Sequence, residues 1–294
     1  MSSAKPISSQ IIFECFVGLA SNATGRLHLN VIEKIDQLLE ESNSTEKPYF
    51  ILDGTHYVPH RRTDLNSFKS ADAIICSAYK FFGPHIGVMA FKGQRFSKLK
   101  PNKVGYRFQP NYQDILDCGP FPSEENCEIS RWEMGTLNYE GLAGFEACID
   151  YLASLSDSDT AESRKCQLDQ SFELIRQHEE LLSETFLNGI RPYLEQNQIR
   201  LLGSRQSQNR TPTFALTMPK KSNETSAGQK LVQVLNQNGI LCTHGNHYAP
   251  DLVENCMKEP EGVTRVSFLH YNTITDVKKV ISVLSKFLDS NENK

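Results

Sequence analysis

Two apolar runs without polar alternation constrain the fold more than any other feature of the sequence. YFILD at residues 49–53 and AIICS at residues 73–77 read as strands with apolar side chains on both faces. Such strands are typical of a parallel sheet that helices cover on both sides. Residues 11–19 form another short apolar run, and residues 31–39 repeat apolar side chains at helical spacing. The order strand, helix, strand, strand predicts a βαβ arrangement in an α/β fold.

The second half of the chain predicts a smaller α/β domain. A buried helix expected from about residue 139 ends the first domain. In the second, helices are expected over 163–194, over 228–237 and from 275, and strands at 199–202, 213–216, 240–243 and 264–269. We place the domain boundary after residue 155, so the predicted domains are residues 1–155 and 156–294. The long polar segment 98–130 is predicted to be an active-site or interface loop, because compact domains rarely keep such a loop unused.

The composition narrows the class of protein. The 294 residues are 39% hydrophobic and 22% charged, with a net charge of −4, which is typical of a soluble globular protein. No basic stripe indicates nucleic-acid binding, and the apolar runs are too short to span a membrane. The eight scattered cysteines include no C-x-x-C pair, and neither they nor the histidines have the spacing of a zinc finger. We therefore expect no metal site and a reducing, cytoplasmic location, with a mitochondrial one as the weaker alternative.

Reactive side chains follow both apolar runs. Asp53 ends the first run, and Lys80 comes three residues after the second. Ligands bind beyond the carboxyl ends of parallel strands, so both residues should lie at the ligand edge. Taken alone, they could form only a surface ion pair. His56 and the hydroxyls of Ser77 and Tyr79 favour a cofactor instead: pyridoxal 5′-phosphate (PLP) needs an amine, a carboxylate and phosphate donors together.

Four segments carry a family resemblance: ASNATG, the block from DGTHYVPH to CSAYKFFGPHIGV, EMGTLNYEGLAG and TRVSFLHYNT. They resemble the cysteine desulfurase-like branch of the class V aminotransferases, which are PLP enzymes of fold type I related to group II cysteine desulfurases and selenocysteine lyases. The resemblance runs from about residue 11 to residue 287. It implies that residues 1–155 form part of the PLP-binding large domain, with a mostly parallel sheet, and residues 156–294 the small α/β domain.

The resemblance also implies a role for each residue around the cofactor. Lys80 would form the Schiff base with PLP and later move the α-proton of the substrate. Asp53 would pair with the pyridinium nitrogen, and His56 would contact the ring hydroxyl. Ser77 would bind the phosphate, together with Tyr79, which stands where relatives commonly carry histidine. For His56 the alternative is a hydrogen-bonding loop residue.

Three further residues complete the implied site. Arg265 would grip the α-carboxylate of an amino-acid substrate, and Asn22 would lie beside both substrate and cofactor. Thr136 would reach the phosphate of a neighbouring subunit, which implies a homodimer with shared active sites. The alternatives are a surface ion pair for Arg265, a turn former for Asn22 and a helix cap for Thr136.

The sequence departs from the family in two places. Where group II desulfurases carry a nucleophilic cysteine, this chain has CTHGNHYAPDL, with His247 or Tyr248 near that position and Cys242 at a predicted strand end as a buried thiol. The family's N-terminal phosphate-binding turn and ring-stacking aromatic residue also have no counterpart before residue 11. We expect a truncated sequence. The two candidate functions are a PLP-dependent enzyme acting on an amino acid and a catalytically inactive fragment acting only through partner binding.

Overall fold

The computed structural model describes residues 14–42, 47–96, 99, 136–156, 163–219 and 226–292, so the predicted loop at 98–130 lies outside it except for one residue. The described chain divides into two compact units. The first holds the residues up to 17, those of 35–52 and those of 64–149; the second holds 18–34, 53–63 and the residues from 150 on. Because the units interleave along the chain, the predicted domain boundary between residues 155 and 156 stays a prediction.

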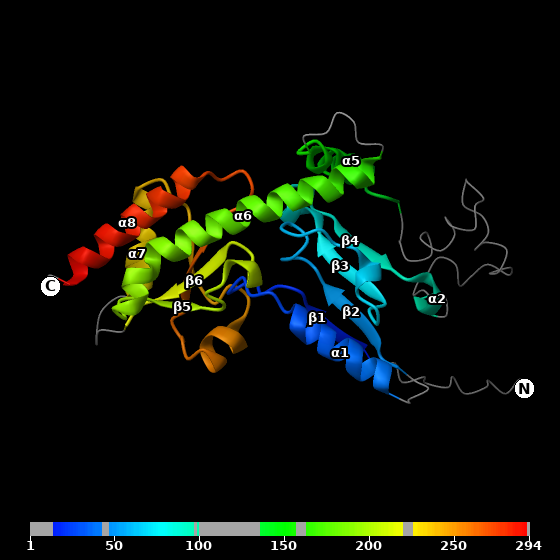
Figure 1. Ribbon diagram of the computed structural model, residues 1–294, viewed down its shortest axis with the longest axis horizontal. Helices are drawn as coiled ribbons and strands as arrows, with labels where there is room; N and C mark the ends of the chain where they lie inside the picture. The colour runs from blue at the N-terminus through cyan, green and yellow to red at the C-terminus, as the bar shows by residue number, and fades with distance from the viewer. Residues whose placement is uncertain are drawn as a thin grey trace, which may run out of the picture. The chain divides into compact units, whose positions relative to one another are not determined.

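The first sheet has the strand order β1-β2-β3-β4 (Figure 1), formed by β1 (Glu14–Gly18), β2 (Tyr49–Asp53), β3 (Ala73–Ser77) and β4 (Gly87–Phe91). The helix α1 (Leu29–Glu41) connects β1 to β2. Phe50, Leu52 and Ala73 are completely buried, as the unalternated apolar runs predict. The predicted fold class is confirmed as an α/β protein with a sheet rich in parallel strands. The second unit holds more residues than the first, so the smaller C-terminal domain is not what this division gives.

The strand β4 is antiparallel to β3, and the sequence did not predict it. Ala73 pairs with Phe91 and Ser77 with Gly87. Only nine residues separate the two strands, too few for the helical crossover that a parallel pair needs. The chain therefore turns back on itself. Among the described residues before 155, the other elements are η1 (Leu65–Ser67), η2 (Ala78–Phe81), α2 (Gly93–Phe96) and α5 (Tyr139–Ala153).

The second sheet is antiparallel throughout its described pairs and has the order β5-β6-β8-β7. Its strands are β5 (Arg200–Leu202), β6 (Thr213–Thr217), β7 (Thr243–Gly245) and β8 (Val263–Ser267). The accompanying helices are α6 (Arg164–Glu195), α7 (Ala227–Gln237), α8 (Ile274–Glu292), the short η3 (Ser207–Asn209) and a π-helix, η4 (Asp251–Cys256).

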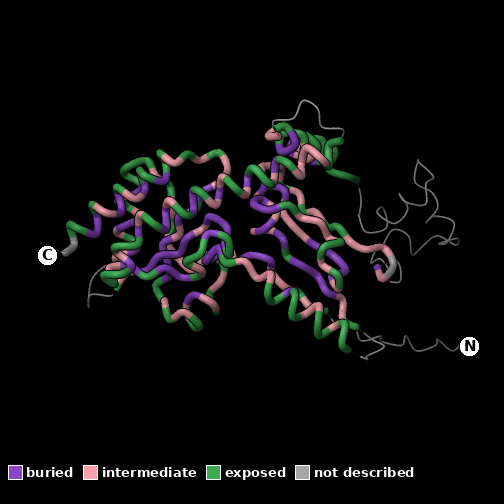
Figure 2. The backbone as a smooth tube through the Cα atoms, viewed as in Figure 1, coloured by how far each residue is buried: buried purple, intermediate pink, exposed green. Residues whose placement is uncertain are grey.

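One apolar core joins this sheet to its helices. Phe186 of α6 packs against Phe214 of β6 with ring centroids 4.5 Å apart, and Leu231 of α7 and Leu284 of α8 belong to the same cluster. These side chains are buried, and Figure 2 colours stretches of these helices and strands purple, for buried residues. The burial of aromatic and branched apolar side chains therefore holds the second unit together.

The predicted strand at residues 240–243 is misplaced, because β7 begins at Thr243. Residues 239 and 240, before β7, form the C-terminal cap of α7 instead. Gly239 adopts a left-handed φ of +72°, and the amide of Ile240 donates to the carbonyl of Leu235 at 3.0 Å. Such a left-handed residue after a helix satisfies the last carbonyl groups and delays the next strand.

The turn that follows β1 depends on Gly25, which predicts a large stability effect. Gly25 has a φ of +72°, and a Cβ there would lie 2.4 Å from the carbonyl oxygen of Thr213. We expect Gly25→Ala to lower the free energy of unfolding by about 1–3 kcal/mol, because it adds both backbone strain and a clash with backbone atoms. Denaturant unfolding measures the change. Gly87→Ala is the matched control, since a Cβ there would meet nothing within 4 Å; an equal loss in both variants would contradict the prediction.

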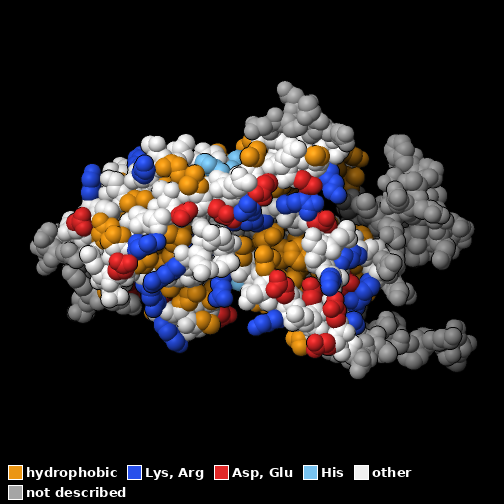
Figure 3. Space-filling model, in the orientation of Figure 1, with side chains coloured by type: hydrophobic (Ala, Val, Ile, Leu, Met, Phe, Trp, Pro, Cys, Tyr) orange, Lys and Arg blue, Asp and Glu red, His pale blue; other side chains and the backbone are white. Residues whose placement is uncertain are grey.

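The described surface carries charges of both signs. On the face that Figure 3 shows, lysine and arginine side chains alternate with aspartate and glutamate side chains, and neither sign covers the face alone. Within the described residues, none of the helices has the length and apolarity that crossing a bilayer requires. The same residues contain no cluster of three or more His, Cys, Asp or Glu side chains arranged to hold a metal ion.

Candidate active site

Lys80 lies in η2, the single 3-10 turn directly after β3. The amide of Gly83 donates to the carbonyl of Ala78 at 2.9 Å and closes this turn. Phe82 ends it with a left-handed φ of 78°. A Cβ on Gly83 would lie 3.1 Å from the Cβ of Ala78, so the close return of the chain favours glycine there. The backbone of Lys80 is therefore held in a tightly closed turn.

Polar and aromatic groups surround this turn within the first unit. The Nζ of half-buried Lys80 lies 5.7 Å from the ring centroid of Tyr79. The Tyr79 ring stacks on His85, with centroids 4.8 Å apart and an angle of 15° between the planes. Ser77 is the N-cap residue of η2, yet its hydroxyl makes no capping hydrogen bond. A serine hydroxyl that is not used as a helix cap can donate to an acceptor such as a phosphate oxygen.

Asp53 and His56 belong to the second unit. Asp53 is the exposed last residue of β2, and its Oδ1 accepts a hydrogen bond from the amide of Thr55 at 2.8 Å. His56 is half-buried in the turn of residues 55–60 that follows. The hydrogen bond to Thr55 therefore fixes the orientation of the Asp53 carboxylate, as expected for an aspartate where a strand ends in a turn.

The structure brings Asn22 and Arg265 together. Nη1 of Arg265, on β8, donates to the side-chain Oδ1 of Asn22 at 2.5 Å and to its carbonyl oxygen at 3.1 Å. The Nδ2 of Asn22 donates to the carbonyl of His247 at 2.7 Å. Burial lowers the pKa of the Arg265 guanidinium. Its hydrogen bonds to described residues use Nη1, so the other edge of the guanidinium can receive a carboxylate with two parallel hydrogen bonds.

Thr136 is exposed, and it does not cap α5. That helix begins at Tyr139, and the Oδ1 of Asn138 accepts a hydrogen bond from the amide of Gly141 at 2.9 Å. This is the geometry of an N-cap side chain. The helix-cap alternative for Thr136 is therefore wrong, and its role at a neighbouring subunit stays a prediction.

The family follows from the whole sequence. The family model of class V aminotransferases matches residues 15–280, which is most of the chain. The chain belongs to the class V aminotransferase family. A probable cysteine desulfurase of Mycoplasma genitalium is 26% identical over 283 residues, covering 94% of this chain and 58% of that protein. An aminotransferase-like protein of Gibberella zeae is 24% identical over 263 residues, covering 88% of this chain and 56% of that protein.

Solved structures show the same fold. The apo structure of a cysteine desulfurase from Thermococcus onnurineus superposes with a TM-score of 0.69 at 20% identity, over 94% of this chain and 60% of that one. A cysteine desulfurase from Escherichia coli gives a TM-score of 0.65 at 19% identity, over 94% of this chain and 59% of that one. The chain thus spans between 56% and 60% of the length of these four proteins.

Class V aminotransferases and cysteine desulfurases are PLP-dependent, and the donor set of this chain fits that cofactor. The amine of Lys80 lies on a closed turn, and the hydroxyl of Ser77 at the start of that turn makes no capping hydrogen bond. An exposed carboxylate ends a strand, and a half-buried guanidinium keeps one edge for an anion. These are the groups that an aldehyde, a phosphate, a pyridinium and an α-carboxylate require.

The region that carries the nucleophilic cysteine in group II desulfurases differs here. Tyr248 is 98% exposed, and both it and His247 have left-handed backbones, with φ values of 62° and 51°. Cys242 precedes β7 and is half-buried against the core of the second unit, not fully buried at a strand end as predicted. Burial raises the pKa of its thiol to about 11, which keeps it protonated and unreactive near neutral pH.

Cys242→Ala should therefore change neither sulfide release from cysteine nor PLP attachment. The thiol is protonated and packed against apolar side chains, so it is unsuited to accept sulfur. Sulfide release from cysteine and PLP attachment to the protein are the two measurements. Cys256→Ala is the control, because that cysteine is exposed. Loss of sulfide release in Cys242→Ala alone, with normal PLP attachment, would restore a persulfide mechanism.

The sequence interpretation missed a set of buried charged residues in the second unit: His60, Arg61, Glu179 and Arg210. One signal was available for Glu179. It lies four residues after Ile175 and three before Leu182, on the apolar stripe of α6, where a carboxylate is unexpected. The other three carried no comparable signal in the sequence.

Proposed function

We propose that this protein is a PLP-dependent enzyme that acts on an amino acid through a Schiff base of Lys80. The observation that carries the proposal is the place of Lys80: a closed turn directly after a buried strand, in a chain of the class V aminotransferase family. The bound cofactor would supply an electron-withdrawing pyridinium ring that stabilises negative charge at the substrate α-carbon. Lys80 would hold the aldehyde and move the α-proton.

The remaining residues would bind and orient. The carboxylate of Asp53 would keep the ring nitrogen protonated, because an opposite charge at close range favours the charged form. His56 would contact the ring hydroxyl, and the hydroxyls of Ser77 and Tyr79 would hold the phosphate. Stacking on His85 supports this role for Tyr79, since the stack limits where its hydroxyl can lie.

Arg265 and Asn22 would select the substrate class. Nη1 of Arg265 is held by Asn22, which fixes the plane of the guanidinium before any ligand arrives. A preorganised planar fork matches a carboxylate better than a point charge does. The proposed substrate is therefore an amino acid bound by its α-carboxylate. Sulfur transfer through Cys242 is left out of the proposal, because its thiol has a raised pKa.

We further propose that the active form is a cytoplasmic homodimer with shared sites. Thr136 is exposed at the start of the segment that leads into α5, where a partner subunit could receive it. Leu137, Tyr139 and Leu142 beside it are also exposed, which supports an interface there.

Covalent trapping tests the proposal. The protein is incubated with PLP and then reduced with borohydride, and the modified peptide is identified by mass spectrometry. We expect the label on the peptide that contains Lys80. Label spread over exposed lysines such as Lys69, or no label at all, would contradict the proposal and favour the non-catalytic, partner-binding alternative.

A further inference from the structure

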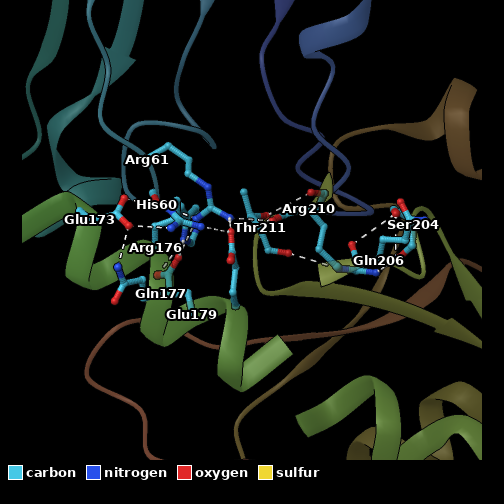
Figure 4. Close-up of polar contacts among 12 residues, drawn as sticks. His60, Arg61, Glu173, Arg176, Gln177, Glu179, Ser204, Gln206, Arg210 and Thr211 are labelled. Carbon is cyan, nitrogen blue, oxygen red and sulfur yellow. Dashed lines mark hydrogen bonds and ion pairs between the residues drawn. The ribbon is translucent and has the colours of Figure 1, made fainter. Parts of the chain in front are cut away.

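A buried charged network lies inside the second unit, away from solvent (Figure 4). His60 and Arg61 are each 7% exposed, whereas Glu179 and Arg210 are 0% exposed. Charged groups are almost never buried this completely unless their partners are fixed. The network therefore indicates that the parts of the chain it joins must keep one geometry.

Glu179 of α6 is the centre of this network. The Nδ1 of His60 donates to it, at 3.0 Å from each carboxylate oxygen. Nη1 of Arg61 lies 3.5 Å from Oε2 of the same carboxylate. Burial lowers the pKa of Arg61, and the charge of Glu179 opposes that effect. Removing the carboxylate would leave a buried guanidinium without its main counter-charge.

The first arm of the network leads to Asp53. The amides of Tyr57 and Val58 both donate to the carbonyl of Gly54 at 2.8 Å, and the amide of Arg61 donates to the carbonyl of Tyr57 at 3.1 Å. These bonds connect the anchor at Arg61 to the strand end at Asp53 within one continuous turn. Glu179 thus fixes the whole segment 53–61 from its far end, and that segment also carries His56.

The second arm leads to Asn22. Nη2 of Arg61 donates to the carbonyl of Arg210 at 3.2 Å, and Nη2 of Arg210 donates to the carbonyl of Thr24 at 3.1 Å. Arg210 also donates hydrogen bonds to the carbonyl groups of Ser204, Thr211 and Thr213. Burial lowers the pKa of Arg210 to about 9.

The turn that Arg210 holds carries a candidate substrate contact. Thr24 lies two residues after Asn22, in the turn that Gly25 ends, and the amide of Thr211 donates to the carbonyl of Gly25 at 2.8 Å. Asn22 in turn orients Arg265. The two arms together reach both groups of candidate site residues in this unit.

We propose that Glu179 is a positioning residue: through Arg61 and Arg210 it couples the segment that carries Asp53 and His56 to the turn that carries Asn22. This inference rests on the proposed function for the meaning of those residues, but the coupling itself is a property of the protein without cofactor. A purely structural ion pair would stabilise its own surroundings without linking the two segments.

Hydrogen exchange of the cofactor-free protein tests the coupling. We expect Glu179→Gln to speed amide exchange about tenfold or more in both segments, 53–61 and 22–25, because a buried charged hydrogen bond is lost at their common anchor. Glu184→Gln is the matched control on the same helix, since its side chain is exposed and no ion pair connects it to Arg61 within the described residues. It should leave both segments unchanged.

A second variant keeps the test decisive if Glu179→Gln unfolds. Arg61→Lys retains the positive charge beside Glu179 but loses the planar fork that also reaches the carbonyl of Arg210. Exchange should then rise in segment 22–25 more than in segment 53–61. Faster exchange confined to residues 60 and 61, or equal acceleration across the whole second unit, would overturn the coupling. Neither result depends on whether PLP binds Lys80, so the proposed function stands or fails separately, by the trapping experiment.

Discussion

Lys80→Ala is expected to abolish covalent PLP attachment and to lower turnover of an amino acid by about 10²–10⁴-fold or more. The variant removes both the amine that holds the aldehyde and the base that moves the α-proton. Without the amine, covalent PLP attachment is lost completely. Loss of the base alone accounts for the expected fall in turnover. Borohydride trapping measures the attachment, and steady-state kinetics at saturating PLP measure the turnover.

Two companion variants separate chemistry from charge. Lys80→Arg keeps the positive charge near the Tyr79 ring, but a guanidinium is not deprotonated in proteins and cannot attack the aldehyde, so this variant should be as inactive as Lys80→Ala. Lys69→Ala removes an exposed lysine paired with Glu40 and should behave as wild type. Substantial turnover in Lys80→Ala, with PLP attached to a different lysine, would refute the assignment of Lys80.

The sequence predicted the elements whose signals are local. The run YFILD forms a buried strand as expected, and the helix expected over 163–194 is α6, which spans Arg164–Glu195. Ser163 explains this precision at the start of the helix, because its hydroxyl accepts from the amide of Cys166 as an N-cap. Local apolar patterns and caps are sufficient for such elements.

The elements that depend on tertiary pairing were missed. The strand β4 has no polar alternation that would reveal a return strand, and its antiparallel register is set by pairing with β3. The π-helix Asp251–Cys256 was also not predicted. Its geometry depends on bonds over five residues, such as the amide of Met257 donating to the carbonyl of Leu252 at 2.9 Å. No sequence propensity distinguishes that spacing from an ordinary helix.

The candidate site shows the same division. Lys80 and Asp53 could be proposed from the sequence, because Asp53 ends an apolar strand and Lys80 follows another, positions that point to the ligand edge of a parallel sheet. The contact between Arg265 and Asn22 could not, because 243 positions separate the two residues and only the fold brings them together. The place of Glu179 on the apolar stripe of α6 was a signal for a buried carboxylate, but only the tertiary structure shows that its partners lie in segment 53–61.

Arg265→Ala is expected to weaken binding of the amino-acid substrate by roughly 2–5 kcal/mol, the range for truncating one partner of a buried charge pair. Its guanidinium is half-buried and already oriented by Asn22, so little ordering cost would remain when a carboxylate binds. The loss should appear mainly as a higher KM. Arg200→Ala, an exposed arginine of the same unit that pairs with Glu259, is the control and should not change KM.

The pair of Arg265 and Asn22 allows a sharper form of this prediction. Asn22→Ala removes the oxygen that accepts from Nη1 of Arg265 at 2.5 Å, so it should raise KM by a smaller factor than Arg265→Ala. In the double variant the two effects should not add, because Asn22 acts through the arginine and has nothing left to orient once the guanidinium is gone. Additive effects would mean that Asn22 binds the substrate independently. An unchanged KM in Arg265→Ala, together with lost PLP attachment, would mean that the arginine binds the cofactor and not the substrate.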